Sequence, residues 1–544
     1  MSRFSRKKRK NPFHMRDFVL VSHPLFMCLA ILLGVALSIS FVLVATHPDV
    51  HVAAKISVED AGMNGRGNRQ PDTNSEGTES LIGPEVPYLP PFAEIENSEQ
   101  LIEDTLNGKP TVAGIVAHLN KFLKELHKSN IKNSKEKLQP NGLVQTYFDL
   151  AMRYLRPLDE PYRGRPIFEI REDDSIFVSL AAFREHLLTQ TLKSAFDQAE
   201  NPENLFIGAA VQNCFGTDGR QCKTGLQVIG KNAQGKDQVK MSDAPPDVNG
   251  IEDFCRDPKY EKHCKSGHIR VLYLHDTDAL GPAVARYYAS KLWGGETYFL
   301  QMDSHLEFAA NWDTKYIAEI KAAKSFPKAI LSSYPPGFTN FGEYSGGSPG
   351  TRLCTCQFSN NDVENHIIRI NTGGRCKGDE PRPTQIAFIA AGFFFARAEF
   401  LIDVPFDPYV PWCFMGEEIA LSIRAWTNGW DIYAPRQNLI AHQYRPGRLG
   451  LPKFWESVGR DSGRPGLNTK VQKHVLRRIK HMVGYTTDTK DSIEAEGDGA
   501  VLTDLEHYTV GNTRSLKDYL ELTNIDLENM KCGYMMWCTR GTLE

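Results

Sequence analysis

Several common signals are missing from this chain of 544 residues, and each absence limits what the protein can be. No Asn-x-Ser or Asn-x-Thr triplet occurs, so N-glycosylation cannot place any part of the chain outside the cytosol. No pair of cysteines has C-x2-C spacing, which disfavours a zinc knuckle. The net charge is only −3 and the basic residues gather at the extreme N-terminus, so no nucleic-acid partner is expected. No internal repeat is visible.

Long apolar runs are also rare, and a single one, "LFMCLAILLGVALSISFVLVA" at residues 25–45, is free of charge. At about 1.5 Å of rise per residue it just spans a hydrocarbon core of about 30 Å. No convincing signal-peptide cleavage site closes it. Lysine and arginine are concentrated before the run, so the positive-inside rule predicts a single-pass type II membrane protein with residues 47–544 across the membrane. The alternative is a buried helix of a soluble domain.

Composition divides the chain into further segments. Residues 47–100 are rich in Gly, Pro and polar residues without periodicity, which is typical of a stem. Apolar residues at helical spacing over 112–137 and 142–155 predict a helical spacer or a small oligomerising element. The predicted domains are a cytosolic basic tail (1–24), a transmembrane signal anchor (25–46), a disordered stem (47–110), a helical stem or spacer (111–173), a large α/β domain (174–455) and a C-terminal extension (456–544).

The α/β domain is indicated by apolar strands that alternate with amphipathic helices. Strands are predicted at 175–183, 204–212 and 269–276, and helices at 184–199 and 281–293. This order favours a mostly parallel central sheet, in which ligands bind outside the carboxyl ends of the strands. Two predicted strands have conspicuously polar ends, "HDTD" and "MDSH".

Ten cysteines follow the apolar run, and an even number permits disulfides in an oxidising compartment. The local pairs Cys214/Cys222, Cys255/Cys264 and Cys532/Cys538 are plausible, although connectivity cannot be deduced from sequence.

The first chemical motif is "MDSH", which contains Asp303 and His305. On an extended segment, side chains at i and i+2 point to the same side. A carboxylate combined with an imidazole suits Mn²⁺, whereas Mg²⁺ is less suited to the nitrogen ligand. The alternative is a polar strand end without a ligand.

Two further motifs contain ionisable groups at element ends. Glu417 and Glu418 follow Gly416 and open an apparent helix, where the helix dipole alone would stabilise carboxylates. His442 closes the apolar strand "NLIAH", and a lone histidine is more often structural than a ligand.

Taken in order, these motifs resemble the nucleotide-sugar-dependent glycosyltransferases of GT-A fold. More closely, the chain resembles the polypeptide α-N-acetylglucosaminyltransferases of glycosyltransferase family 60, and more distantly the mucin-type N-acetylgalactosaminyltransferases. The resemblance covers roughly residues 174–450. The matching stretches are "IFVSLAAFRE", "NPENLFIGAAVQ", "GPAVARYYASKLWGGETYFLQMDSHLEFAANWDTKYI", "FIAAGFFFARAEFLIDVPFDPY" and "FMGEEIALSIRAWTNGWDIYAP".

The resemblance implies roles for particular positions. Asp303, His305 and His442 would hold Mn²⁺, or Mg²⁺ in its place, against the two UDP phosphates. Arg286 and Asp303 would lie near the donor. The positions implied to face the uridine are Ser179, Ala181, Arg184 and Glu185.

The resemblance also implies that Glu417 and Glu418 lie near the acceptor hydroxyl and the sugar. Trp426 and Trp430 are interpreted either as sugar-stacking residues or as core aromatics. Adjacent helical side chains diverge by about 100°. One glutamate, for which we choose Glu417, is therefore expected to face the substrate, and the other to pair with Arg424 or a backbone amide.

The function implied is transfer of N-acetylglucosamine from UDP-GlcNAc to a Thr, Ser or hydroxyproline hydroxyl of a protein, with retention of configuration. Some family members are cytoplasmic and modify hydroxyproline on a ubiquitin-ligase adaptor, whereas the signal anchor favours a lumenal acceptor and the Golgi membrane. The alternatives are another UDP-sugar, such as UDP-GalNAc, or an inactive lectin-like membrane protein.

Overall fold

The computed structural model describes residues 91–543 apart from 218–219, 226, 363, 445–453 and 455–466. The predicted tail, the signal anchor and most of the stem therefore lie outside the described residues. Within the described part of the chain, no helix is both long enough and apolar enough to cross a membrane.

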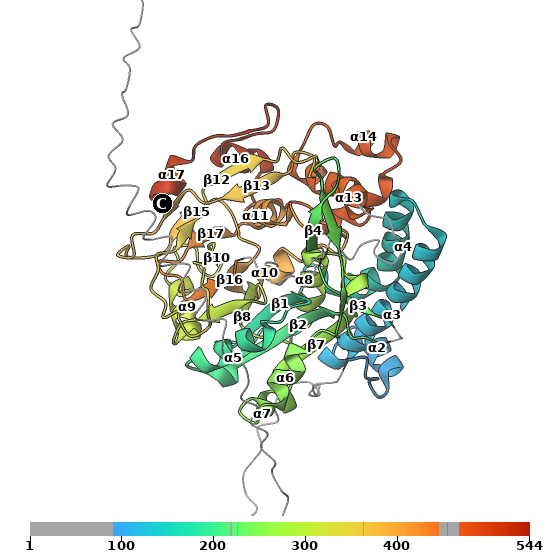
Figure 1. The fold of residues 1–544 in the computed structure, drawn as a ribbon. Coiled ribbons are helices and arrows are strands. Elements are labelled where there is room, and N and C mark those ends of the chain that lie inside the picture. Colours follow the sequence, from blue (N-terminus) through green and yellow to red (C-terminus); the bar gives the residue numbers. More distant parts are fainter. Residues whose placement is uncertain are drawn as a thin grey trace, which may run out of the picture. The chain divides into compact units, whose positions relative to one another are not determined.

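An eight-stranded sheet forms the centre of the domain (Figure 1). Its strands, from one edge to the other, are β15 (Thr384–Ile386), β17 (Asp431–Ala434), β10 (Ala329–Ser332), β16 (Phe393–Arg397), β8 (Tyr298–Met302), β1 (Ile176–Phe183), β2 (Leu205–Asn213) and β7 (Ile269–His275). β8, β1, β2 and β7 are parallel neighbours, and β10 is parallel to β17. β16 and β15 run antiparallel to their neighbours. The predicted α/β fold with a mostly parallel sheet is confirmed.

Both faces of the sheet are covered, as expected for strands whose residues are mostly apolar and almost all buried. Successive residues of β1 point to opposite faces, so Phe177 and Val178 belong to two different hydrophobic clusters. The cluster of Phe177 includes residues of α3 (Val112–Glu136), α4 (Pro140–Asp159) and α8 (Pro282–Ser290). The cluster of Val178 includes residues of α5 (Leu188–Gln198), α6 (Gly250–Arg256) and α9 (Trp312–Lys321).

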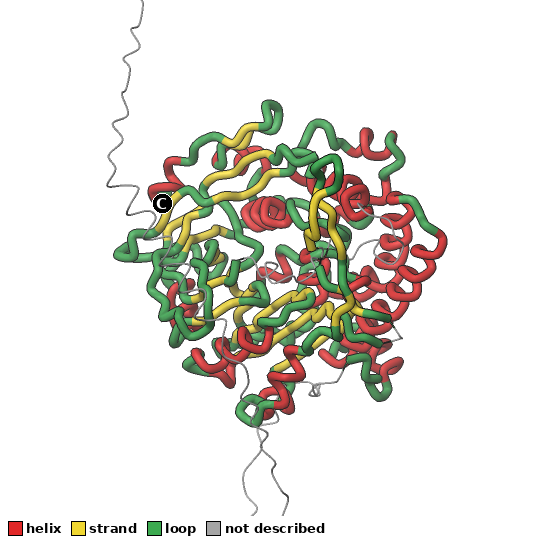
Figure 2. The backbone as a smooth tube through the Cα atoms, in the orientation of Figure 1, coloured by secondary structure: helices red, strands yellow, loops and turns green. Residues whose placement is uncertain are grey.

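The predicted N-terminal helices are confirmed as α3 (Val112–Glu136) and α4 (Pro140–Asp159). They lie next to the sheet, at the right of the view in Figure 2, and the Tyr147 hydroxyl donates a hydrogen bond to the Pro408 oxygen at 2.8 Å. A further helix, α2 (Ser98–Leu106), lies inside the stretch predicted as a disordered stem, so that prediction is wrong for these residues. The domain boundary at residue 173 stays a prediction, although one core joins both sides of it.

Smaller elements surround the sheet. The helix predicted from residue 184 begins only at Leu188. Arg184 itself cannot be helical, because its φ is positive, at 49°. Residues 340–380, where Gly and Asn are frequent, contain short strands. The remaining elements are α7 (Glu261–Lys265), α10 (Phe400–Asp403), α11 (Glu417–Thr427), α14 (Lys490–Ala495), α15 (Leu505–Tyr508), the 3-10 turns η1 (Glu160–Tyr162), η2 (Pro202–Asn204), η3 (Asp276–Asp278) and η5 (Gly499–Leu502), and the two-stranded ladders β3–β6 (Cys222–Lys223, Asp243–Ala244), β4–β5 (Gln227–Lys231, Asp237–Lys240), β9–β18 (Leu306–Phe308, Ile440–His442), β11–β14 (Thr351–Arg352, Gly374–Arg375) and β12–β13 (Thr355–Phe358, Ile368–Asn371).

The C-terminal segment packs into the same core through α13 (Leu467–Val483) and α16 (Leu516–Leu522). It is also tied covalently to the middle of the chain. Cys354 pairs with Cys538 in α17 (Met536–Arg540). Cys356 pairs with Cys532 on β20 (Lys531–Cys532), a strand that pairs with β19 (Ile525–Asp526).

The disulfides confirm two of the three local pairs, Cys214–Cys222 and Cys255–Cys264. The predicted pair Cys532/Cys538 is wrong, because folding places β12 against β20 and so brings both cysteines to partners 176 and 184 residues away. Cys376 and Cys413 are free and buried.

Candidate active site

The site lies where β8 ends. Asp303 directly follows Met302, the last residue of β8, and its backbone N–H donates to the Gly392 oxygen at 3.1 Å. The antiparallel ladder β9–β18 then pairs Leu306 with His442. Although β18 lies more than 130 residues later in the chain, this pairing places His442 beside His305.

The three predicted metal ligands come together. His442 Nε2 lies 3.0 Å from Asp303 Oδ2 and 3.0 Å from His305 Nε2. One donor atom from each residue lies within 4.8 Å of the other two. The buried His442 Nδ1 has no hydrogen-bond partner among the described residues. Two imidazole nitrogens and a carboxylate oxygen that converge on one point are a donor set that suits a divalent transition-metal ion.

Glu185 contacts one of the three predicted metal ligands. Its Oε2 lies 2.8 Å from His305 Nδ1, on the side of the ring away from His442, and its Oε1 accepts from the Leu187 N–H at 2.9 Å. A carboxylate on the second ring nitrogen orients a ligating histidine and selects its tautomer. The geometry thus makes Glu185 a positioning residue for His305; contact with uridine stays a prediction.

Arg286, on α8, connects the trio to the helix α11. It donates to Asp303 Oδ1 at 2.8 Å and to Glu417 Oε2, and it is 6% exposed. Burial disfavours its charge, but the carboxylates of Glu417 and Asp303 outweigh burial and raise the pKa of Arg286. Burial would raise the pKa of Asp303, yet the hydrogen bond from His442 and the charge of Arg286 hold it well below its usual range.

The two adjacent glutamates diverge at the start of α11. Gly416, with φ 99°, is the N-cap. Glu417 Oε2 pairs with Arg286, while its buried Oε1 has no partner among the described residues. Glu418 accepts from the Tyr334 hydroxyl at 2.9 Å and from the Ala391 N–H at 3.1 Å. Burial raises the pKa of Glu418 to about 7.

The second glutamate was predicted to pair with Arg424 or a backbone amide, and the backbone amide of Ala391 is the one found. Arg424 donates to the main-chain oxygens of Pro405 and Thr509. Tyr334, which sequence reasoning missed, is the second partner of Glu418. The sequence signal that could have identified Tyr334 is its position just after β10, in "SSYPPGF". Ligand-binding residues of α/β sheets lie at the ends of the strands.

Gly392, which directly precedes β16, lies against the Asp303 carboxylate. A Cβ at this position would lie 2.7 Å from Asp303 Oδ2, closer than non-bonded atoms come. Because Gly392, in "AAGFFF", has no side chain, the Asp303 carboxylate has room beside it.

Three further predicted residues lie in β1 or directly after it. Ser179 is fully buried in mid-strand, and its hydroxyl has no partner among the described residues. Ala181 accepts a hydrogen bond from the Ser304 hydroxyl through its main-chain oxygen at 3.3 Å. Arg184 is 4% exposed and donates to both carboxylate oxygens of Asp247, at 2.6 and 2.8 Å. Their contacts with uridine stay predictions.

The two tryptophans are held by protein contacts. Trp430 is 1% exposed, and its indole N–H donates to Asp403 Oδ2 at 2.9 Å, which favours the core interpretation. Trp426 is half-buried and packs against Tyr519 at 5.5 Å between ring centroids.

Comparison with protein families gives one finding that spans the site. A family model described as Glycosyltransferase (GlcNAc) matches residues 175–529, which is more than half of the chain. The matched region includes all the residues discussed above. No curated protein matches the chain at a significant level.

Two solved structures are similar at a low level. GalNAc-T7 with UDP, GalNAc and Mn²⁺ has 14% sequence identity and a TM-score of 0.38, over 65% of this chain and 57% of the other. S. aureus TarS 1–349 in complex with UDP-GlcNAc has 14% identity and a TM-score of 0.28, over 62% of this chain and 84% of the other. Because both TM-scores lie below 0.5, neither likeness supports a further conclusion.

Proposed function

The chain belongs to the Glycosyltransferase (GlcNAc) family, and from this premise we propose that it transfers N-acetylglucosamine from UDP-GlcNAc to a hydroxyl of a protein acceptor, Thr, Ser or hydroxyproline. The proposal includes retention of the anomeric configuration and dependence on Mn²⁺. The observation that carries it is the convergence of Asp303, His305 and His442 beyond the carboxyl end of β8, where an α/β sheet binds its ligands.

The donor set fits a divalent cation, with Asp303, His305 and His442 as the residues that would hold it. When bound, such an ion neutralises the charge that develops on a departing diphosphate. The residues themselves must be positioned before the donor arrives. Glu185 orients His305, and Arg286 holds the Asp303 carboxylate in place.

Glu417 is the group that we assign to the sugar or the acceptor. One of its oxygens is held by Arg286, and the other is buried without a partner among the described residues. Burying an unpaired carboxylate oxygen is costly, which supports a substrate hydroxyl as its partner.

The proposed transfer is a front-face displacement. The acceptor oxygen bonds to the anomeric carbon as the bond from that carbon to the UDP phosphate oxygen breaks. The acceptor proton passes to the departing phosphate oxygen. No protein base is required on the opposite face, which is compatible with the pairing of Glu417 with Arg286.

The cellular setting is proposed from the sequence. The apolar run at residues 25–45, after a basic tail, supports a type II protein of the Golgi membrane with a lumenal catalytic domain. Protection of the C-terminus from protease in intact microsomes tests this, and a cleaved C-terminus would contradict it.

The activity is tested by release of UDP from a panel of UDP-sugars with and without Mn²⁺. We expect turnover with UDP-GlcNAc that Asp303→Asn abolishes, and a gain of one N-acetylhexosamine mass on a protein acceptor. Turnover with UDP-GalNAc alone would assign a different donor. No turnover with any donor, together with intact sugar binding, would support an inactive lectin-like protein.

A further inference from the structure

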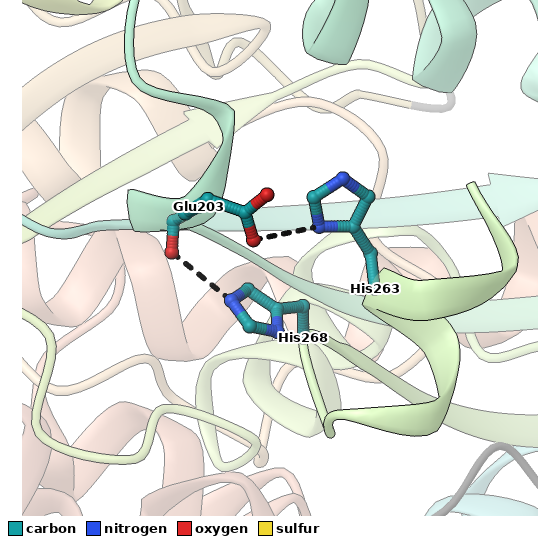
Figure 3. Close-up of side chains that lie close together, drawn as sticks. All are labelled: Glu203, His263 and His268. Carbon is teal, nitrogen blue, oxygen red and sulfur yellow. Dashed lines mark hydrogen bonds and ion pairs between the residues drawn. The ribbon is translucent and has the colours of Figure 1, made fainter. Parts of the chain in front are cut away.

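A second cluster of ligand-type side chains lies away from the active site. It consists of Glu203 in η2, His263 in α7 and His268, which directly precedes β7 (Figure 3). One donor atom of each residue lies within 4.8 Å of the other two. Within the described part of the chain, this cluster and the active-site trio are the two groups of three such side chains that share this geometry.

His263 is the most informative member. Its side chain is 3% exposed, and its buried Nδ1 has no hydrogen-bond partner among the described residues. The nearest carboxylate oxygen, Glu203 Oε2, lies 3.6 Å away, and the two groups point toward one another in Figure 3. That separation is too long for a good hydrogen bond. It is close to the roughly 3.3 Å between two ligands of a tetrahedral ion at about 2.0–2.1 Å.

His268 offers the third nitrogen of the cluster. Its Nδ1 lies 2.7 Å from the Ser266 oxygen and its Nε2 lies 3.0 Å from the Glu203 main-chain oxygen, so either ring nitrogen has a partner for its proton. In the tautomer whose proton is on Nδ1, that N–H donates to the Ser266 oxygen and Nε2 has a lone pair for a cation.

From this geometry we propose that Glu203, His263 and His268 form a binding site for a Zn²⁺ ion. The ligands are Glu203 Oε2, His263 Nδ1 and His268 Nε2, with water completing a tetrahedral shell. By the general order of affinities, a site of two imidazoles and one carboxylate binds Zn²⁺ more tightly than Mn²⁺. The active-site trio has the same donor set, so it must be removed when zinc binding at this cluster is tested. Lys262, which pairs with Glu203 Oε1, and Ser266, on His268, hold the ligands from behind.

The site is remote from the transferase centre. Glu203 lies two residues before the start of β2, and His268 lies directly before the start of β7. Asp303 instead follows the end of β8, and these strands run parallel within one sheet. β7 alone has seven residues, which at about 3.3 Å each separates the two edges by on the order of 20 Å. The Zn²⁺ ion therefore clamps η2, α7 and the start of β7 next to the Cys255–Cys264 disulfide.

The test is the zinc content of the full-length protein, measured by competition with a chromophoric chelator. Because the active-site trio can also take zinc, the reference is a variant with that site removed, His305→Gln/His442→Gln. We expect the reference to bind one Zn²⁺ and to gain thermal stability from it. Adding His263→Gln should weaken this binding by at least about tenfold and abolish the stabilisation.

Two further variants make the result decisive. Glu203→Gln alters an exposed side chain, so it tests the ligand set without disturbing the core. His474→Gln is the matched control, because His474 also pairs with a carboxylate, Asp498 at 2.9 Å, but lies outside both clusters. Unchanged zinc binding in the His263 and Glu203 variants, or none in the reference, overturns the proposal. Activity with Mn²⁺ is independent of this outcome.

Discussion

At the scale of single residues, Glu185 has a contact that suggests a role beside the one implied by the resemblance. Its carboxylate lies 2.8 Å from His305 Nδ1, while the implied contact with uridine stays a prediction. That contact fixes the ring so that Nε2 faces His442 and Asp303. A substitution at Glu185 should therefore act through the metal rather than through the nucleotide.

We predict that Glu185→Gln weakens Mn²⁺ binding by about 10- to 100-fold, because it loses the charged partner that orients His305. Titration of Mn²⁺ by electron paramagnetic resonance, without donor, measures this. Binding of metal-free UDP should stay the same. Unchanged Mn²⁺ affinity together with weakened UDP binding would restore the uridine assignment.

Glu417 and Glu418 are neighbours whose different contacts predict different effects. Glu417→Gln should lower kcat by at least about tenfold, or about 1.4 kcal/mol in transition-state stabilisation, because its unpaired oxygen is assigned to the substrate. Glu418→Gln, whose oxygens bind Tyr334 and Ala391, should mainly change stability. Steady-state kinetics and melting curves separate the two, and equal losses of kcat would contradict the division.

The pKa of Glu418 also predicts a pH dependence. Burial raises it from 4.5 to about 7, so the folded protein binds this proton more tightly than the unfolded chain does. The resulting stability, up to about 3 kcal/mol, is present below about pH 4.5 and is lost as the pH rises to about 7. Glu418→Gln should therefore lose less stability than the wild type between pH 5 and 8 in urea unfolding. Parallel curves would contradict the shift.

At the scale of elements, the site depends on how strand ends meet. Asp303 is delivered by the end of β8, His442 by the ladder β9–β18, and the space for the carboxylate by Gly392 on the approach to β16. None of these elements forms the site alone. The donor atoms of Asp303, His305 and His442 converge because the end of β8 lies beside the β9–β18 ladder.

Gly392→Ala should displace the Asp303 carboxylate, because the new Cβ would lie 2.7 Å from Oδ2. We expect Mn²⁺ affinity and activity to fall at least about tenfold while the fold persists, since the backbone of Gly392 is not left-handed. Isothermal titration with Mn²⁺ measures the effect.

The matched control is Gly337→Ala. Gly337 bridges to His442 in the same region, but a Cβ there meets nothing closer than 3.5 Å. It should bind Mn²⁺ as the wild type does. Equal losses in both variants would show that the clash with Asp303 is not the cause.

At the scale of the whole molecule, segments from both ends of the described chain pack on the central domain. α3 and α4 join the core of α8, and α13 joins the same cluster. Two disulfides link residues near position 355 to the C-terminal segment. The C-terminal segment is thus a structural part of the domain that carries the site.

We predict that the long-range disulfides contribute more stability than the local ones. Cys354–Cys538 and Cys356–Cys532 close almost the same loop, so the long loop opens only when both are removed. Loop-closure entropy then gives about 5 kcal/mol for the 176-residue separation, against about 2.5 kcal/mol for the 8-residue separation of Cys214 and Cys222. Melting of the variant with all four long-range cysteines changed to Ser should therefore be lower than that of Cys214→Ser/Cys222→Ser. The reverse order would mean that strain or residual structure dominates.

Much of the fold followed from the sequence because its causes are local. Apolar runs of strand length and helical spacing predicted β1, β2, β7, α3 and α4, and the i, i+2 spacing predicted that Asp303 and His305 share a side. The disulfides Cys214–Cys222 and Cys255–Cys264 join residues close in sequence, so short spacing was a sufficient guide.

Tertiary structure alone decided the contacts between distant segments. Glu185 on His305, Arg286 between Asp303 and Glu417, and Cys538 with Cys354 all depend on which elements become neighbours. Spacing and periodicity carry no information about such pairs, because the free energy that selects them comes from burying whole faces of the sheet and its helices. The sequence determined which chemical groups were available, and packing decided which of them meet.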